Sequence, residues 1–145
     1  MTKQIKQEFV FHCGAESILN ALTEEKHLRN WWTTEAVLRD GKGVFPFAGY
    51  GWFVELNIKK SLAQKSVSWK CTKSNMQNTN AWEGSTVTYK LIPDGTSTNV
   101  HFLHTKYKDS PCYDACSEGW SHFLGASLKK YLETGKGLPY SASGQ

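Results

Sequence analysis

The sequence has no long hydrophobic run. No apolar segment approaches the roughly 20 residues that a membrane-spanning helix requires, and residues 1–8 contain no apolar segment of the kind that directs secretion. We therefore expect a cytoplasmic protein with no membrane span. The net charge is only +4 and no basic block is present, so we expect no nucleic acid among its partners.

Cysteine is also scarce. The chain has four cysteines, which is too few for a disulfide scaffold in 145 residues, and it has no Asn-x-Ser/Thr glycosylation site. We therefore expect reduced thiols at all four positions: Cys13, Cys71, Cys112 and Cys116.

The spacing of cysteine and histidine matches no common zinc pattern. Cys112 and Cys116 could face one way on a helix, but His101 and His104 are three residues apart on a predicted strand and point to opposite faces of it. His122 adds no recognised spacing. We therefore predict no metal site, and no feature of the sequence calls for a cofactor.

Motifs for phosphate binding and acyl transfer are missing too. The pairs Gly41/Gly43 and Gly49/Gly51 do not lead into a helix whose amides could hold an anion, so we interpret them as turns between strands. No Gly-x-Ser-x-Gly nucleophile motif is present. The sequence thus predicts no assembled catalytic set.

Aromatic residues, in contrast, are abundant. The chain contains six Trp, six Tyr and seven Phe, and such rings either fill a core or line a hollow one. Its length suits one domain, which at this size buries roughly 68–70% of the surface that the unfolded chain exposes. We expect a single domain over residues 1–140 and a frayed C-terminal tail over residues 141–145.

Hydrophobic periodicity predicts the order of the elements. Residues 5–12 alternate like a strand, and residues 15–32 change to a helical period in two short segments. Residues 33–107 are strand-like and are interrupted by turn sequences, which leaves room for five or six strands. Two stretches without periodicity, 72–82 and 108–111, are predicted to be loops.

Three of the predicted strands alternate cleanly between apolar and polar residues. This alternation predicts an antiparallel sheet with one covered face and one wet face. The residues predicted to face inward are Val67, Trp69 and Cys71, then Val87, Tyr89 and Leu91, and finally Val100, Phe102 and His104.

A long amphipathic helix near the C-terminus is the predicted cover. Gly135 occupies the position where a left-handed residue commonly ends a helix, and Pro139 prevents the helix from resuming. One face of this helix collects the residues Cys116, Trp120, Phe123, Leu124, Ser127, Leu128, Tyr131 and Leu132.

This order of elements is that of the helix-grip fold, and particular segments make the likeness more specific. The segments are 9–11, 15–23, 31–32, 40–45, 98–102 and, as the most diagnostic, 119–137. Together they resemble the START-like superfamily (SRPBCC, birch-pollen-allergen-like), in the branch of homologues of the heat-shock chaperone ATPase activator. The resemblance implies an α+β helix-grip fold. We expect a curved antiparallel sheet of six to seven strands wrapped around the C-terminal helix, with two short helices after the first strand.

The resemblance also implies an apolar cavity between the sheet and the last helix. We expect it to bind a hydrophobic or aromatic small molecule of unknown identity. The residues alone leave open whether this space is a pocket or a packed core. The residues expected to line it are Trp69, Tyr89, Phe102, His104, Trp120, Phe123, Leu124 and Leu128.

Two other functions stay open. A stress-linked module that contacts a chaperone would use exposed aromatic residues such as Trp52 or Trp82. A cyclase- or hydrolase-type enzyme would use His104 as its base, although an imidazole satisfied by a neighbouring hydroxyl or carbonyl is the simpler arrangement. The sequence favours a binding protein over an enzyme.

Overall fold

The computed structural model of the protein describes residues 2–76, 82–108 and 113–141. The strands are β1 (Thr2–Phe11), β2 (Val37–Arg39), β3 (Lys42–Phe47), β4 (Trp52–Ser61), β5 (Ser66–Ser74), β6 (Thr86–Asp94) and β7 (Ser97–Lys108). The helices are α1 (Ala15–Thr23), α2 (Glu25–Trp31), the short 3₁₀ helix η1 (Ala48–Tyr50), α3 (Tyr113–His122), the π-helix η3 (Phe123–Leu128) and α4 (Lys129–Thr134).

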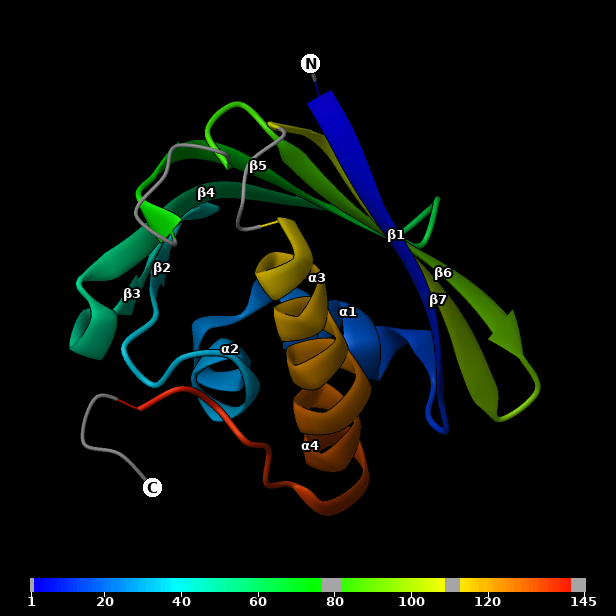
Figure 1. Cartoon of the computed structure of the whole chain (residues 1–145). Helices are drawn as coiled ribbons and strands as arrows, with labels where there is room; N and C mark the ends of the chain where they lie inside the picture. The colour runs from blue at the N-terminus through cyan, green and yellow to red at the C-terminus, as the bar shows by residue number, and fades with distance from the viewer. Residues whose placement is uncertain (1, 77–81, 109–112, 142–145) are drawn as a thin grey trace.

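All seven strands form one antiparallel sheet in the order β1-β7-β6-β5-β4-β3-β2. From β2 to β7 each strand pairs with the next one along the chain, whereas β1 pairs with β7, with Phe9 opposite Val100. Figure 1 shows the sheet arching over the helices. The predicted α+β helix-grip fold with a curved antiparallel sheet is confirmed.

The inner face of the sheet carries the predicted apolar residues. Register places Tyr89 between Val67 on β5 and Phe102 on β7. Tyr89, Trp69 and His104 have no exposed surface. The alternation seen in the sequence therefore identified the buried face, as expected for an antiparallel sheet covered on one side.

The two short helices close one end of this core. Four residues of α1 are buried, and the Trp31 indole N–H at the end of α2 donates to the Ala21 carbonyl at 2.8 Å. The Trp69 indole N–H reaches from the sheet to the Leu22 carbonyl at 3.0 Å. These two bonds join α1 to α2 and to β5 within the apolar interior.

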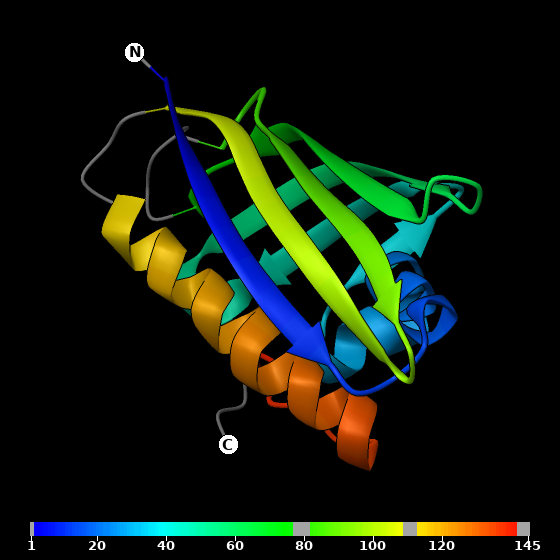
Figure 2. The same ribbon diagram turned by 90° about the vertical axis from the view of Figure 1, so that its right-hand side faces the viewer.

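The C-terminal helix runs continuously through α3, η3 and α4 and lies under the concave side of the sheet, with β1 alongside it (Figure 2). Its middle turn is a π-helix, which the periodicity of the sequence did not predict. Gly135 ends the helix with a φ of 85°, and its N–H donates to the Tyr131 carbonyl at 2.8 Å. The predicted left-handed end of this helix is confirmed.

Beyond Gly135 the chain turns back along α2, and we call residues 136–140 the C-terminal strap. Tyr140 forms a parallel bridge with Thr33 and donates its N–H to the Trp32 carbonyl at 2.8 Å. The Thr34 N–H in turn donates to the Tyr140 carbonyl at 3.0 Å. Of the tail predicted to fray, residues 142–145 lie outside the described part of the chain.

Two predictions about loops need correction or lie outside the described residues. β5 continues to Ser74, so the predicted loop at 72–82 begins too early, because cross-strand pairing with β4 extends the strand into polar sequence. Trp82, which the chaperone-linked alternative would need at the surface, is only 4% exposed. Residues 77–81 and 109–112 are not described.

Within the described ranges, no helix is long and apolar enough to cross a bilayer.

Candidate functional site

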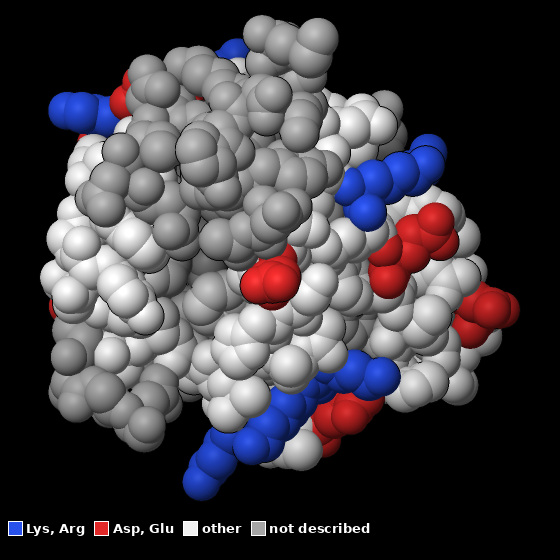
Figure 3. Space-filling view, in the orientation of Figure 1, with Lys and Arg blue, Asp and Glu red and all other residues white. Residues whose placement is uncertain are grey.

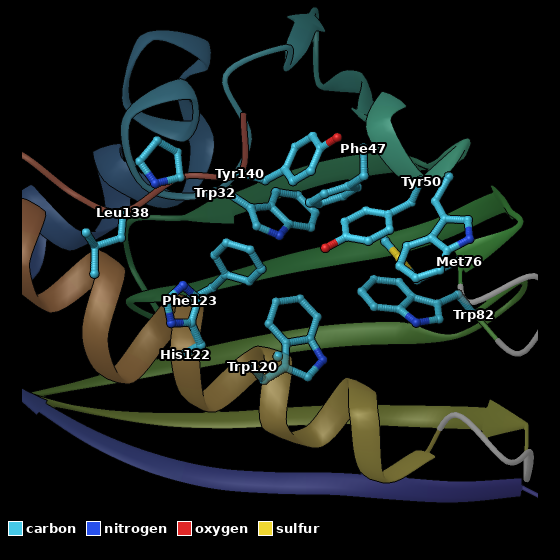
Figure 4. A pocket seen from close by; sticks show the side chains of 13 residues that line it. Trp32, Phe47, Tyr50, Met76, Trp82, Trp120, His122, Phe123, Leu138 and Tyr140 are labelled. Atoms are coloured by element: carbon cyan, nitrogen blue, oxygen red, sulfur yellow. The ribbon is translucent and has the colours of Figure 1, made fainter. Parts of the chain in front are cut away.

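A pocket of about 770 Å³ lies between the C-terminal helix, the β3–η1–β4 corner and the C-terminal strap. Figure 4 shows the side chains that converge on it from these elements. On the molecular face shown in Figure 3, the surface over β3 and η1 is mostly uncharged. The described lining residues are Trp32, Phe47, Tyr50, Trp52, Met76, Trp82, Gly119, Trp120, His122, Phe123, Leu138, Pro139 and Tyr140.

Aromatic rings dominate this lining. Eight of the thirteen described residues are Phe, Trp or Tyr, and none is Lys, Arg, Asp or Glu. Neighbouring rings pack against one another: the centroids of Tyr50 and Trp52 are 4.5 Å apart in a near-parallel stack, and those of Trp82 and Trp120 are 5.3 Å apart. Such a surface favours an apolar ligand with ring systems of its own.

Tyr50 is the most exposed ring of the pocket, at 62% exposure. Its hydroxyl points into the hollow toward Trp32 and Phe123 (Figure 4). Gly51, which follows η1 with a φ of 74°, reverses the chain so that Trp52 can stack on Tyr50. The corner therefore presents one hydroxyl group to a space whose described lining is mainly apolar.

The C-terminal strap closes the opposite side. It contributes Leu138, Pro139 and Tyr140 to the lining. The Tyr140 hydroxyl points away from the hollow and accepts a hydrogen bond from the Gly49 N–H, which ties the strap to η1. The Tyr140 ring also packs on Phe47, with centroids 5.1 Å apart. The strap is thus part of the pocket wall.

Behind the Trp82 and Trp120 wall lies His104. The Trp120 indole N–H donates to His104 Nδ1 at 3.3 Å, and His104 Nε2 lies 2.8 Å from the Ser85 hydroxyl oxygen. Burial lowers the pKa of His104 to about 3, so the imidazole is neutral near pH 7. With no exposed surface, His104 is not positioned to contact a ligand as a base. The hydrogen bond between His104 and the Ser85 hydroxyl is the arrangement expected from the sequence.

The eight residues predicted to bind a ligand fall into two groups. Trp120 and Phe123 line the pocket directly. The other six pack in the interior behind it, each no more than 1% exposed: Trp69, Tyr89, Phe102, His104, Leu124 and Leu128. Trp69 and Phe102 contact Trp120, with ring centroids 6.2 and 4.8 Å apart. Part of the space under the helix is therefore packed core, and the pocket occupies only the part nearer η1.

Most of the lining was not predicted from the sequence. Tyr50 was interpreted only as a turn residue, and residues 138–140 lie beyond the predicted helix end. The sequence could have indicated burial in both places. An aromatic residue between two glycines and an apolar Leu-Pro-Tyr run are unusual in connections that face solvent. His122 was considered only as a metal ligand.

A second, smaller pocket of about 350 Å³ lies where α1, α2 and α4 meet. There His27 Nδ1 is 2.6 Å from the Tyr131 hydroxyl, and His27 Nε2 is 3.6 Å from the Glu24 carboxylate. Burial and the Glu24 charge raise the pKa of Tyr131. This cluster joins α2 to the C-terminal helix at a half-exposed position.

A comparison with known protein families shows which family this chain belongs to. A family model described as "Activator of Hsp90 ATPase homolog 1-like protein" matches residues 12–133. The chain belongs to this family. A search of curated proteins finds no match.

Solved structures agree with this membership in the activator-homologue family. The chain is 26% identical to the Aha1 dimer of Colwellia psychrerythraea, whose solution structure it matches with a TM-score of 0.78 over 93% of this chain and 99% of that one. A Staphylococcus saprophyticus protein is 17% identical, with a TM-score of 0.69 over 97% of this chain and 99% of that one. DynU16, from the dynemicin biosynthetic locus, is 15% identical, with a TM-score of 0.64 over 92% of this chain and 48% of that one. The last two likenesses show the fold alone.

Proposed function

We propose that this protein binds a hydrophobic small molecule with aromatic character in the pocket beside η1. The pocket itself carries the proposal, because its described lining combines eight aromatic rings with no charged side chain around a cavity of about 770 Å³. That volume falls within the roughly 300–1,000 Å³ of typical small-molecule sites. Family membership supports the proposal, since proteins of this fold typically bind hydrophobic ligands.

Within this proposal the predicted site residues take two roles. Trp120 and Phe123 contact the ligand, together with the Tyr50 and Tyr140 rings on the facing wall. The six buried residues predicted from the sequence support Trp120 and the sheet from behind. The Tyr50 hydroxyl offers the ligand a hydrogen bond.

Native mass spectrometry of freshly purified protein tests the proposal first. We expect a co-purified small molecule, or enhanced fluorescence of the neutral apolar probe N-phenylnaphthylamine together with a rise in melting temperature. Saturation at a hundredfold excess over Kd would stabilise the fold by about 2.7 kcal/mol. No bound mass and no thermal shift across a panel of apolar aromatic compounds would reject the proposal.

Two matched variants test whether the fluorescent probe binds in this pocket. Gly119 lines the pocket, and a Cβ added there meets no atom within 4 Å, so a side chain introduced by Gly119→Leu starts from open space beside the hollow. Ala126→Leu makes a similar addition at an exposed position of the same helix that is outside the pocket lining. We expect Gly119→Leu to lose probe binding while Ala126→Leu retains it, with both proteins folded.

A chaperone-linked role is the alternative that the family description suggests. Of the two aromatic residues predicted for such a role, Trp82 is buried, and Trp52 is half-buried and stacks on Tyr50 in the pocket wall. We therefore favour ligand binding over a chaperone-linked role. We also propose that the protein works in the cytoplasm, a location that the small number of cysteines in the sequence supports.

A further inference from the structure

We propose that His104 is a positioning residue that holds Trp82 and Trp120 in place and thereby sets the shape of the aromatic pocket. The inference rests on the proposed ligand-binding role of that pocket and goes beyond it, because it assigns the control of ligand fit to a residue that does not touch the ligand. Trp82 and Trp120 form adjoining parts of the wall, as Figure 4 shows.

The hydrogen bonds around His104 have a defined direction. An indole nitrogen can only donate, so Nδ1 accepts from the Trp120 N–H at 3.3 Å. The Ser85 hydroxyl donates to the Trp82 carbonyl, which leaves its oxygen to accept from Nε2–H at 2.8 Å. The imidazole is therefore the neutral tautomer with its proton on Nε2. The Ser85 hydroxyl contacts both His104 and Trp82, so these bonds link the two tryptophans.

Ring contacts reinforce this arrangement. The His104 ring meets Trp82 edge-on, with centroids 4.8 Å apart, and meets Trp120 edge-on at 5.9 Å. His104 has no exposed surface, and the two tryptophans are only 4% and 2% exposed. In such a low-dielectric interior a lost hydrogen bond is not replaced by water, so the indole of Trp120 would turn to find another acceptor. That rotation would change the wall of the pocket.

The test separates positioning from simple packing with two substitutions of His104. The Asn oxygen lies near the place of Nδ1 and can still accept from Trp120, whereas the longer Gln side chain reaches the place of Nε2 and can still bond Ser85. We expect His104→Gln to weaken N-phenylnaphthylamine binding by about tenfold and His104→Asn by less than about threefold. If His104 only filled space, the smaller Asn would leave the larger cavity and would be tolerated less well than Gln, which is the opposite order.

Nuclear magnetic resonance supplies a readout that needs no ligand. The indole N–H signal of Trp120, assigned by its absence in Trp120→Phe, should be protected from solvent exchange in the native protein and in His104→Asn. It should lose protection in His104→Gln. Retained protection in His104→Gln would overturn the inference, whether or not the wild-type pocket binds the probe. A wild-type protein that binds no compound but shows this loss of protection would reject the proposed function and not the role of His104.

Ser85→Ala provides a second variant in case either substitution of His104 prevents folding. Ser85 is hydrogen-bonded to His104 and to the Trp82 carbonyl, and its oxygen holds the His104 proton on Nε2. Without that acceptor the proton can move to Nδ1, where it opposes the Trp120 N–H. We expect the Trp120 indole to exchange at least about fivefold faster in Ser85→Ala. An unchanged exchange rate in this variant would contradict the proposed linkage.

Discussion

His104 and Tyr89 are polar residues on the otherwise apolar inner face of the sheet. Burial disfavours the charged form of each, so it lowers the pKa of His104 to about 3 and raises the pKa of Tyr89 well above its ordinary value. The two side chains differ in their hydrogen-bond partners. Both ring nitrogens of His104 are hydrogen-bonded, whereas the buried Tyr89 hydroxyl has no partner among the described residues.

The first prediction concerns stability at acidic pH. Unfolded His104 takes up a proton below its ordinary pKa of 6.5, whereas the folded residue remains neutral down to about 3. The unfolded state then binds more protons, so the free energy of unfolding should fall as the pH drops from 6.5 toward 3. The expected slope from this residue is about 1.4 kcal/mol per pH unit. Urea denaturation at a series of pH values measures it.

His104→Asn is the control for this pH dependence. It removes the titrating group, and the other histidines and carboxylates are unchanged. The stability difference between wild-type protein and the variant should therefore shrink as the pH falls and level off below about 3. A difference that is constant across this range would show that His104 does not titrate as its burial requires.

The second prediction concerns the buried Tyr89 hydroxyl. Because this group was desolvated without gaining a described partner, Tyr89→Phe should be neutral or should stabilise the protein by up to about 1 kcal/mol. Tyr131→Phe is the matched comparison, since it removes a hydroxyl 2.6 Å from His27 and should cost about 0.5–1.5 kcal/mol. Equilibrium denaturation compares them. A loss above about 1 kcal/mol in Tyr89→Phe would indicate a partner for the hydroxyl.

The C-terminal helix and the strap act as one unit because of Ser127. This residue lies in the π-helical turn η3, and its hydroxyl donates to the Trp31 carbonyl at 2.6 Å and accepts from the Leu138 N–H at 2.7 Å. A single buried hydroxyl thus connects the helix, α2 and the strap. Because π-helical turns are frequent at functional sites, their occurrence beside the pocket fits the proposed role.

The third prediction concerns the close passage of the strap over α2. A Cβ at Gly137 would overlap the Asn30 carbonyl and lie 3.0 Å from Trp31 Cα and 3.1 Å from the Ser127 carbonyl. We expect Gly137→Ala to destabilise the protein by about 1–3 kcal/mol and to weaken probe binding, because Leu138 must move with the strap. Thermal and urea denaturation with probe titration measure both effects.

Gly119→Ala is the control for Gly137→Ala. An added Cβ at Gly119 has open space, and replacing glycine inside a helix by alanine should stabilise the protein by up to about 1 kcal/mol. We expect the two substitutions to change the free energy of unfolding in opposite directions. Equal effects would mean that the strap yields easily at Gly137 and is not a fixed wall of the pocket.

The described part of the molecule shares one continuous hydrophobic core. The same cluster of buried residues includes Phe11 on β1, Trp31 on α2, Trp69 on β5 and Trp120 on the C-terminal helix. The first strand, β1, also pairs with the last strand, β7, along most of its length. This pairing joins the N-terminal part of the chain to the end of the sheet-forming segment. A single domain over residues 1–140 stays a prediction, which unfolding experiments can test.

The fourth prediction follows from this shared core. Far-ultraviolet circular dichroism reports the whole backbone, and fluorescence of the six tryptophans reports several elements, including α2, β4, β5 and α3. We expect both to follow one urea transition with the same midpoint, as in two-state domains. Two separate midpoints would show that part of the chain unfolds independently and would contradict the single domain.

The fold could be predicted from the sequence because its elements follow local rules. The alternation of Val87, Tyr89 and Leu91 identifies an inner face by period two, and Gly135 marks a helix end by its need for a positive φ. The site could be predicted only in part. Trp120 and Phe123 belong to the pocket, but nothing in their spacing shows that the space beside them is hollow whereas the space beside Leu124 is filled.

The sequence by itself determined the order of the elements along the chain, the buried face and the closing helix, because periodicity and turn residues act on neighbours along the chain. The tertiary structure alone decided where the cavity lies and what encloses it. Tyr50, Trp120 and Tyr140 come from a corner, a helix and a strap that are far apart in sequence. A cavity is the space that packed side chains leave unfilled, so it depends on distances between elements and not on the residues of any one of them.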